Sequence, residues 1–254
     1  TITIPSGATF TNSGTTSAIT ISGALTVDGG TIKLDGNYPT GTSNVALGNT
    51  ALDSVESGGT NNVAIGDEAG TAITTGDNNT AVGFEALKAT TTSANNTAIG
   101  SCALDANTTG ASNTAVGRNS LGANIDGIYN SAVGHNSLAS NTTADNNTAI
   151  GYSALVSNTT GTHNTAIGSC SLNDNTTASY NTAFGKQTLE HNVTGEGNTG
   201  IGYQTLCTQN HADADFNTGV GYRALRVNSE GNNNTAIGKE ALCANTTADN
   251  NTAV

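Results

Sequence analysis

The stretch Asn96-Thr97-Ala98-Ile99-Gly100-Ser101-Cys102-Ala103-Leu104 decides the fold of this chain, because close copies of it recur at a nearly fixed spacing. Positions are counted here from the motif asparagine, which is register one. The copies begin at Asn44, Asn62, Asn79, Asn96, Asn113, Asn130, Asn147, Asn164, Asn181, Asn198, Asn217, Asn234 and Asn251. Most steps are seventeen residues, the first is eighteen and the step from Asn198 to Asn217 is nineteen. A short fixed period is typical of a solenoid, in which each turn buries its apolar face against its neighbours.

Each repeat contains a short strand, a corner and a second apolar position. Thr-Ala-Ile at registers two to four predicts a strand, and register four, which is never polar from Leu47 to Val254, predicts the core. Register three is Ala except at Gly200 and Gly219, which indicates the close approach of another backbone. Gly at register five predicts a corner with positive φ or no room for a Cβ atom. Leu recurs at register nine and should fill the space beside register four.

Two asparagine columns predict hydrogen-bonded ladders along the stack. Stacked in register, each amide can bond to the identical amide above and below it. The residues assigned to ladders are Asn96, Asn113, Asn130, Asn147 and Asn164 at register one, and Asn107, Asn141 and Asn158 at register twelve. The Asn-Thr-Thr sequences at register twelve also match the glycosylation pattern. We favour the ladder, because recurrence at one register is what a ladder requires.

The predicted architecture is all-β: a parallel β-solenoid, or β-roll, of 17-residue repeats. Residues 44–254 form the shaft, with twelve full repeats and the start of another, and residues 1–43 form an N-terminal β strand-and-turn segment. One Ile or Val and one Leu per turn bury little area against an ordering cost of about 1–2 kcal/mol per residue. We therefore predict a parallel homotrimer, in which three chains pack their Ala/Gly faces around a common axis.

The composition excludes several classes of protein. The net charge of −12 leaves no basic stripe for nucleic acid. No apolar run approaches the roughly 20 residues needed to cross a bilayer, so no membrane insertion is expected. Because the chain contains no Met and stops four residues into another repeat, we expect it to be part of a longer polypeptide.

The cysteines share registers in pairs, Cys102 with Cys170 and Cys207 with Cys243. At about 4.8 Å per turn the members of each pair lie roughly 19 and 10 Å apart. A disulfide needs Cα atoms within about 7 Å, so neither pair can bridge within the chain. Free thiols are the favoured interpretation, and interchain bridges are the alternative.

Catalytic machinery is not predicted. The four histidines sit at differing registers, and no carboxylate pair suited to glycoside hydrolysis faces a common groove. Asp213 and Asp215 lie close together in the longest turn, where a solvated loop is favoured over a calcium site. We therefore assign no catalytic residue, no metal and no cofactor.

Register six, directly after the Gly corner, varies while its neighbours are fixed, which indicates exposure to solvent. Exposed Tyr, Arg and Lys side chains are those that form recognition surfaces for sugars or proteins, although random decoration of an exposed face is the alternative. The candidate receptor-facing residues are Phe84, Arg118, His135, Tyr152, Lys186, Tyr203, Tyr222 and Lys239. Aromatic residues also directly precede the motif Asn at Tyr129, Tyr180 and Phe216.

The motif Asn-Thr-Ala-Ile-Gly-x-x-Ala resembles the Ala-Ile-Gly-x-x-Ser/Ala repeats in the heads of trimeric autotransporter adhesins, although the present repeat is longer. The opening Thr1-Ile2-Thr3-Ile4-Pro5-Ser6-Gly7-Ala8-Thr9-Phe10 is similar to segments of tail fibres of tailed bacteriophages. The first resemblance implies a left-handed parallel β-roll assembled as a trimer, and the second implies a virion protein.

The expected function is that of a non-enzymatic structural shaft in a phage tail fibre, located in the virion, which positions host-receptor binding. The expected partners are two further copies of the chain, other virion tail proteins and, through weak contacts, host surface glycans or proteins. The alternative is a bacterial trimeric surface adhesin that binds ligands at the cell surface. A glycan-degrading tailspike is disfavoured by the missing carboxylate pair.

Overall fold

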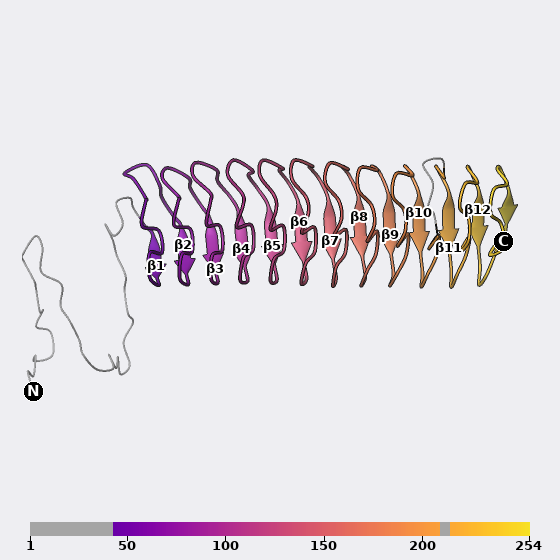
Figure 1. The fold of residues 1–254 in the computed structure, drawn as a ribbon, viewed down its shortest axis with the longest axis horizontal. Helices are drawn as coiled ribbons and strands as arrows, with labels where there is room; N and C mark the ends of the chain where they lie inside the picture. Colours follow the sequence, from indigo (N-terminus) through magenta and orange to yellow (C-terminus); the bar gives the residue numbers. More distant parts are fainter. Residues whose placement is uncertain (1–42, 209–213) are drawn as a thin grey trace, which may run out of the picture. The chain divides into compact units, whose positions relative to one another are not determined.

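The repeats form an all-β parallel solenoid in a computed structural model that describes residues 43–208 and 214–254. About twelve turns of about seventeen residues follow one another in a single row, and no helix occurs among the described residues (Figure 1). The predicted N-terminal segment lies outside the described residues except for Ser43. The strands are β1 (Val45–Leu47), β2 (Val63–Ile65), β3 (Thr80–Val82), β4 (Thr97–Ile99), β5 (Thr114–Val116), β6 (Ser131–Val133), β7 (Thr148–Ile150), β8 (Thr165–Ile167), β9 (Thr182–Phe184), β10 (Thr199–Ile201), β11 (Thr218–Val220), β12 (Thr235–Ile237) and β13 (Thr252–Ala253).

One parallel sheet contains all thirteen of these strands in sequence order. Residues of equal register pair across neighbouring strands, as Ala98 pairs with Ala115 between β4 and β5. Backbone N–H groups donate to carbonyls of an adjacent turn on the strand and also beyond it, as Thr97 N does to Asn113 O at 2.8 Å and Leu104 N to Ser120 O at 3.1 Å. The prediction that identical registers stack turn upon turn is therefore confirmed.

The side of the strand that faces the interior differs from the sequence-based expectation. In β4, Ala98 is fully buried whereas 41% of Ile99 is exposed, and the same alternation recurs along the sheet. The assignment of register four to the core was therefore wrong for the single chain. The Ala/Gly column at register three lies inside the chain's own coil, so it offers no face to other chains.

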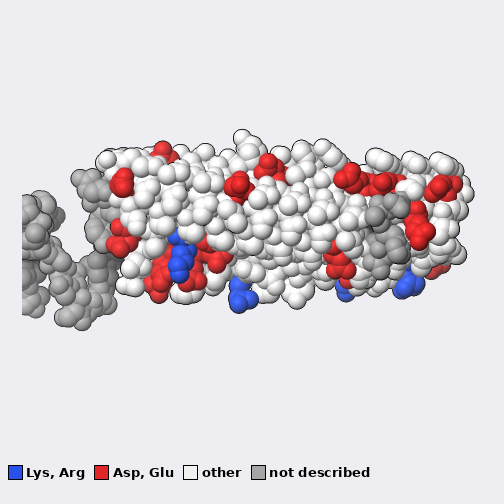
Figure 2. Space-filling model, turned by 45° about the horizontal axis from the view of Figure 1, so that its top comes forward, with Lys and Arg blue, Asp and Glu red and all other residues white. Residues whose placement is uncertain are grey.

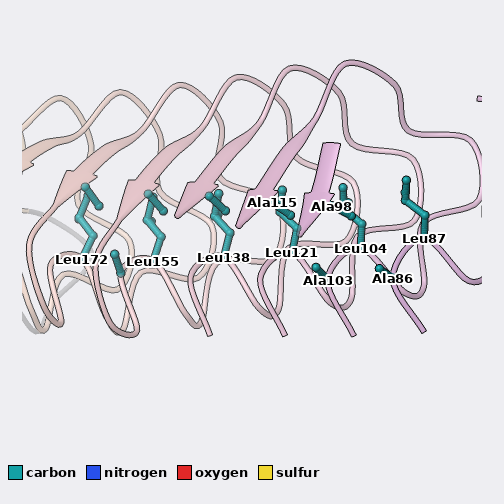
Figure 3. Packing of buried hydrophobic residues seen from close by; sticks show 14 of the residues in the cluster. Ala86, Leu87, Ala98, Ala103, Leu104, Ala115, Leu121, Leu138, Leu155 and Leu172 are labelled. Atoms are coloured by element: carbon teal, nitrogen blue, oxygen red, sulfur yellow. The ribbon is translucent and has the colours of Figure 1, made fainter. Parts of the chain in front are cut away.

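Leucine at register nine explains why register three must be small. The Leu side chains of successive turns form a fully buried row, and the Ala side chains of the strands lie within the same buried cluster (Figure 3). The coil is so thin that one Leu per turn fills the space behind the strand. Each Leu, such as Leu104 with φ of 52°, adopts the left-handed backbone region. Burial of a Leu is worth about 1.5–3 kcal/mol, which outweighs a left-handed cost of about 1–2 kcal/mol.

The two glycines at register three show how closely the interior of the coil is packed. A Cβ atom on Gly200 would lie 2.6 Å from the Thr188 Cγ2 atom, and one on Gly219 would lie 2.6 Å from the Thr205 Cγ2 atom. Register eight is Ala or Ser in every other full repeat, but it is Thr at Thr188 and Thr205. A larger residue at register eight therefore requires Gly at register three of the following turn.

The register-five glycines are required by both conformation and space. Gly100 has φ of 140°, and a Cβ atom there would lie 2.5 Å from the carbonyl oxygen of Gly117 in the next turn. Side chains rarely adopt this φ, and the neighbouring carbonyl leaves no room for one. The corner predicted at this position is present for both of the expected reasons.

The register-one asparagines hold the turns together through backbone groups. The backbone N–H of Asn113 donates to the Asn96 Oδ1 atom at 3.0 Å, and the Asn113 Nδ2 atom donates to the carbonyl of Gly127 at 2.7 Å. Equivalent bonds connect the buried Asn130, Asn147 and Asn164. In these turns the bonds differ from the amide-to-amide pairs expected from the sequence, because the amide oxygen accepts from a backbone N–H. The expected amide-to-amide bonds do form at register one near the C-terminus, where Asn217, Asn234 and Asn251 each donate from Nδ2 to the asparagine Oδ1 atom of the preceding turn.

At register twelve the amides do bond to one another. Asn124 Nδ2 donates to Asn107 Oδ1 at 2.9 Å, Asn141 Nδ2 to Asn124 Oδ1 at 2.9 Å and Asn158 Nδ2 to Asn141 Oδ1 at 3.0 Å. The second amide hydrogen bonds a carbonyl three residues further on, as from Asn141 to Ala144. Asn107, Asn141 and Asn158 are fully buried, so a glycan on them would require the turns to separate.

Candidate binding surface

The register-four side chains form a continuous exposed stripe, called here the outer apolar row. Figure 1 shows the strands that carry it lying side by side. Among its members, Ile99, Ile150 and Ile201 are each about two-fifths exposed. The row comprises Leu47, Ile65, Val82, Ile99, Val116, Val133, Ile150, Ile167, Phe184, Ile201, Val220 and Ile237. Apolar side chains scattered singly over a surface are ordinary, whereas a contiguous patch marks an interaction site.

The register-six side chains, called here the variable column, lie two residues beyond the outer apolar row. Phe84, Arg118, Tyr152, Lys186, Tyr203, Tyr222 and Lys239 are exposed, and His135 is half-buried. The structure thus places the candidate receptor-facing residues at the surface and brings most of them together in two groups. Phe84 and Lys186 stand outside both groups.

The first group joins three successive turns. The Arg118 Nη1 atom lies 3.3 Å from the His135 Nε2 atom, and the rings of His135 and Tyr152 stack with centroids 5.6 Å apart. The His135 Nδ1 atom is buried without a hydrogen-bond partner. The group presents a cation, an imidazole and a phenol in a line along the stack.

The second group is formed by two tyrosines and two cations. The rings of Tyr203 and Tyr222 stack with centroids 5.7 Å apart. Arg223 Cζ lies 4.9 Å from the centroid of Tyr222, and Lys239 Nζ lies 6.0 Å from it. Aromatic rings with a polar edge beside cations can contact sugar rings, acidic groups or peptide surfaces.

Four further exposed rings, called here the corner aromatics, directly precede a motif asparagine. They are Tyr129, His163, Tyr180 and Phe216. Their φ values lie between 56° and 64°, in a column where other turns carry Asn, Ser or Gly. His163 and Tyr180 stack with centroids 5.1 Å apart. His163 was missed by sequence analysis, which counted only Phe and Tyr at this register.

An acidic group near the N-terminal turns already contains a cation. Lys88 Nζ lies 2.5 Å from Glu68 Oε2 and 2.6 Å from Glu85 Oε1, with Cys102 and Asp105 beside them. The hydrogen bond from Lys88 lowers the pKa of Glu85, and the bonds to Glu68 and Glu85 raise the pKa of Lys88. Burial raises the pKa of Asp105.

A second group contains His and Cys ligands. Glu190, His191 and Cys207 each place one ligand atom within 4.8 Å of the other two. His191 Nδ1 lies 2.7 Å from Asp174 Oδ2, and Cys207 Sγ lies 3.7 Å from Glu190 Oε2. Burial, followed by the charge of Glu190, raises the pKa of the Cys207 thiol to about 11. Sequence analysis missed this group because its members belong to registers ten and eleven, which were not examined as columns.

The candidate calcium ligands are not both described. Asp213 lies outside the described residues. Asp215 Oδ1 accepts the backbone N–H of Glu196 at 2.7 Å, and Asp77, Asp145 and Asp249 accept equivalent backbone bonds. These carboxylates therefore cap the corner of the preceding turn. The four cysteines are free thiols.

Charged groups are sparse on the surface. Most of the face in Figure 2 belongs to uncharged residues, and the acidic side chains are scattered along it. Among the described residues, the structure contains no helix able to span a membrane.

Comparison with protein-family models, curated proteins and solved structures finds no match to this chain. The repeat, the outer apolar row and the exposed rings are the features of this chain that bear on its function.

Proposed function

We propose that this chain is the structural shaft of a bacteriophage tail fibre, without enzymatic activity, which positions host-receptor binding in the virion. A shaft needs a constant cross-section that can be extended by adding identical units. The sheet supplies this property, because thirteen strands pair in register and neighbouring turns share backbone hydrogen bonds. The observation that carries the proposal is this uninterrupted stack combined with an apolar row along its outside.

The outer apolar row supports assembly of the shaft as a parallel homotrimer. A row of Ile and Val side chains left in water favours association, because covering it removes apolar area at about 25 cal/mol per Å². The row runs through successive strands, so copies lying side by side in the same direction cover it along its whole length. The resemblance to adhesin heads favours three copies. The surface offered is register four, in place of the Ala/Gly face expected from the sequence.

The variable column supports a weak contact with the host. Tyr and Arg are enriched where interfaces gain most of their binding energy, and here they are already held by stacking. The stacked pairs His135–Tyr152 and Tyr203–Tyr222 lose less freedom on binding than isolated side chains would. We assign these two groups to host surface glycans or proteins, and we assign the ends of the shaft to other virion tail proteins.

Labelling with antibodies raised against the purified chain tests this assignment. Virions and bacterial cells from the source of the sequence are imaged by electron microscopy after gold labelling. Label along thin fibres at the phage tail is the expected result. Label on neither particle would contradict the proposal, and so would release of oligosaccharides from capsular polysaccharide by the purified chain.

A bacterial trimeric surface adhesin is the second candidate. It is favoured by the likeness of Asn-Thr-Ala-Ile-Gly-x-x-Ala to the adhesin-head repeat, and it relies on the same outer apolar row. Gold label confined to the bacterial envelope would select this candidate over the tail fibre.

A further inference from the structure

We propose that Glu190, His191 and Cys207 form a binding site for one zinc ion on the side of the solenoid. The three residues come from two adjacent turns, because Glu190 and Cys207 both occupy register ten and therefore stack. Imidazole nitrogen, thiolate sulfur and carboxylate oxygen are the three ligand types that Zn²⁺ accepts in proteins.

The distances among the three ligands suit a tetrahedral ion. The Glu190 Oε2 atom lies 3.9 Å from the His191 Nε2 atom and 3.7 Å from the Cys207 Sγ atom. Zinc at about 2.0–2.2 Å from N or O and about 2.3 Å from S requires ligand separations of roughly 3.3–3.6 Å. Side-chain rotations that move these atoms by a few tenths of an ångström close the difference for these two pairs, and the His191 and Cys207 ligand atoms lie within 4.8 Å of each other. A water molecule completes the coordination on the solvent side, where the His191 side chain is 45% exposed.

Asp174 orients the histidine for this role. Its Oδ2 atom lies 2.7 Å from His191 Nδ1, so the neutral imidazole carries its proton on Nδ1 and turns the Nε2 lone pair toward Glu190. A carboxylate on the far nitrogen of a ligating histidine is the usual outer partner in zinc sites. Asp174 and His191 share register eleven and therefore stack, as Glu190 and Cys207 do.

Neighbouring side chains hold the other ligands and balance the charge. The Gln187 Nε2 atom donates to both Glu190 carboxylate oxygens, at 3.1 and 2.9 Å. Cys207 is buried and lies close enough to Arg223 and Arg226 to feel their charge. The Zn²⁺ charge equals that of the Cys207 thiolate and the Glu190 carboxylate together, and Asp174 offsets one of the two arginine charges. On binding, the thiol proton leaves to solvent.

The acidic group near Lys88 provides an internal comparison. Glu85, Cys102 and Asp105 also place ligand atoms within 4.8 Å of one another, but the Lys88 ammonium lies among them at 2.6 Å from Glu85 Oε1. That group has no histidine, and its charge is already neutralised by a fixed cation. We therefore expect zinc to select the His191 group.

Metal titration of the reduced full chain tests the proposal, with Zn²⁺ in calorimetry and Co²⁺ in absorption spectroscopy. We expect one equivalent to bind and Co²⁺ to produce a thiolate-to-cobalt charge-transfer band. His191→Ala and Cys207→Ser should weaken binding about a hundredfold or more, and Asp174→Asn about 10–100-fold. The matched variants His163→Ala and Cys170→Ser, which change the same residue types elsewhere, should leave affinity unchanged.

Two results would overturn the site. One is no saturable binding of either metal by the folded wild-type chain. The other is a cobalt band that persists in Cys207→Ser and is lost in Cys102→Ser. Circular dichroism of each variant establishes that the turns remain folded. Asp174→Asn keeps all three ligands in place, so it provides a reading even if His191→Ala unfolds.

Discussion

Ala98 and Ile99 are neighbours in one strand, yet the smaller side chain is buried and the larger one is exposed. Leu104 and its equivalents fill most of the interior of the coil. The space that remains beside the strand fits only Ala or Gly. The outside has no such limit and carries the β-branched residues that the strand prefers. In a coil this thin, uniformly small side chains mark the inside of the strand, and the uniformly apolar side chains of register four lie on the outside of the single chain.

Removing an inner amide should produce the largest loss of stability. In Asn147→Ala, the backbone N–H of Asn164 loses its acceptor and the carbonyl of Gly161 loses a donor. The Gly161 carbonyl keeps its bond from Asn158 Nδ2, so the Asn164 N–H is the group left without a partner. An orphaned buried group costs about 1–3 kcal/mol and a lost hydrogen bond about 0.5–1.5 kcal/mol, so the free energy of unfolding should fall by roughly 1.5–4.5 kcal/mol. Urea unfolding followed by circular dichroism measures the change.

Asn173→Ala is the matched control on the outside. Asn173 is half-buried, and its Nδ2 atom donates a longer bond of 3.3 Å to the Ser153 carbonyl. Its loss should cost less than about 1 kcal/mol. Equal losses in the two variants would contradict the distinction between inside and outside.

A double-mutant cycle between Gly200 and Thr188 tests whether their two side chains occupy one shared space. Gly200→Ala should destabilise by about 1–3 kcal/mol, because the added methyl group meets the Thr188 Cγ2 atom. Adding Thr188→Ala should restore part of that loss, with a coupling of about 0.5–3 kcal/mol. Additive effects in the cycle would show that the two positions do not share one space.

The corner aromatics should lower stability where they replace Asn. Tyr129 adopts φ of 58° and is 61% exposed, so its ring gains little from burial. Tyr129→Asn should raise stability by up to about 1 kcal/mol, because Asn tolerates the left-handed region better. Tyr152→Asn, which removes a stacked ring at ordinary φ, should give no gain. Thermal unfolding compares the two variants.

The smallest effect on stability should come from the ion pair of Lys88 with Glu85, and it should be confined to acidic pH. The Lys88 hydrogen bond holds the pKa of Glu85 below its ordinary value, so this pair stabilises the chain above that value. The contribution is lost as the pH falls through the lowered pKa. In Lys88→Gln the Glu85 pKa should rise and that part of the acid dependence should disappear. Carboxyl titration by NMR between about pH 2 and 6 checks this, and an unchanged Glu85 pKa would contradict it.

The repeat predicts the period, the all-β class and the stacking of registers, because backbone pairing depends on spacing alone. It does not predict which side of the strand faces inward. Hydropathy predicts that Ile99 faces the interior. In the structure Ala98 faces the interior instead, because only a small side chain fits in the space that Leu104 leaves. Gly70 shows the same rule, since it replaces the usual Leu and Ile73 fills the place.

The exposed column at register six could be read from its variability, because solvent tolerates any side chain. The group around His191 could not, because its residues are unremarkable in any single repeat. Only stacking brings Asp174 under His191 and Glu190 under Cys207. The signal is present in the sequence as two columns. Glu190 and Cys207 follow each other at register ten, and Asp174 and His191 follow each other at register eleven, although neither register has a consensus residue.

Sedimentation equilibrium tests the role of the outer apolar row most directly. The wild-type chain should sediment as three copies of 25.2 kDa. The double variant Val133→Glu and Ile150→Glu should sediment as a folded single copy, because both positions are exposed in the chain. Tyr129→Ser with Tyr180→Ser, two exposed positions outside the row, should remain trimeric. A wild-type chain that stays at 25.2 kDa at micromolar concentration, or a trimer that survives both glutamates, would contradict the account.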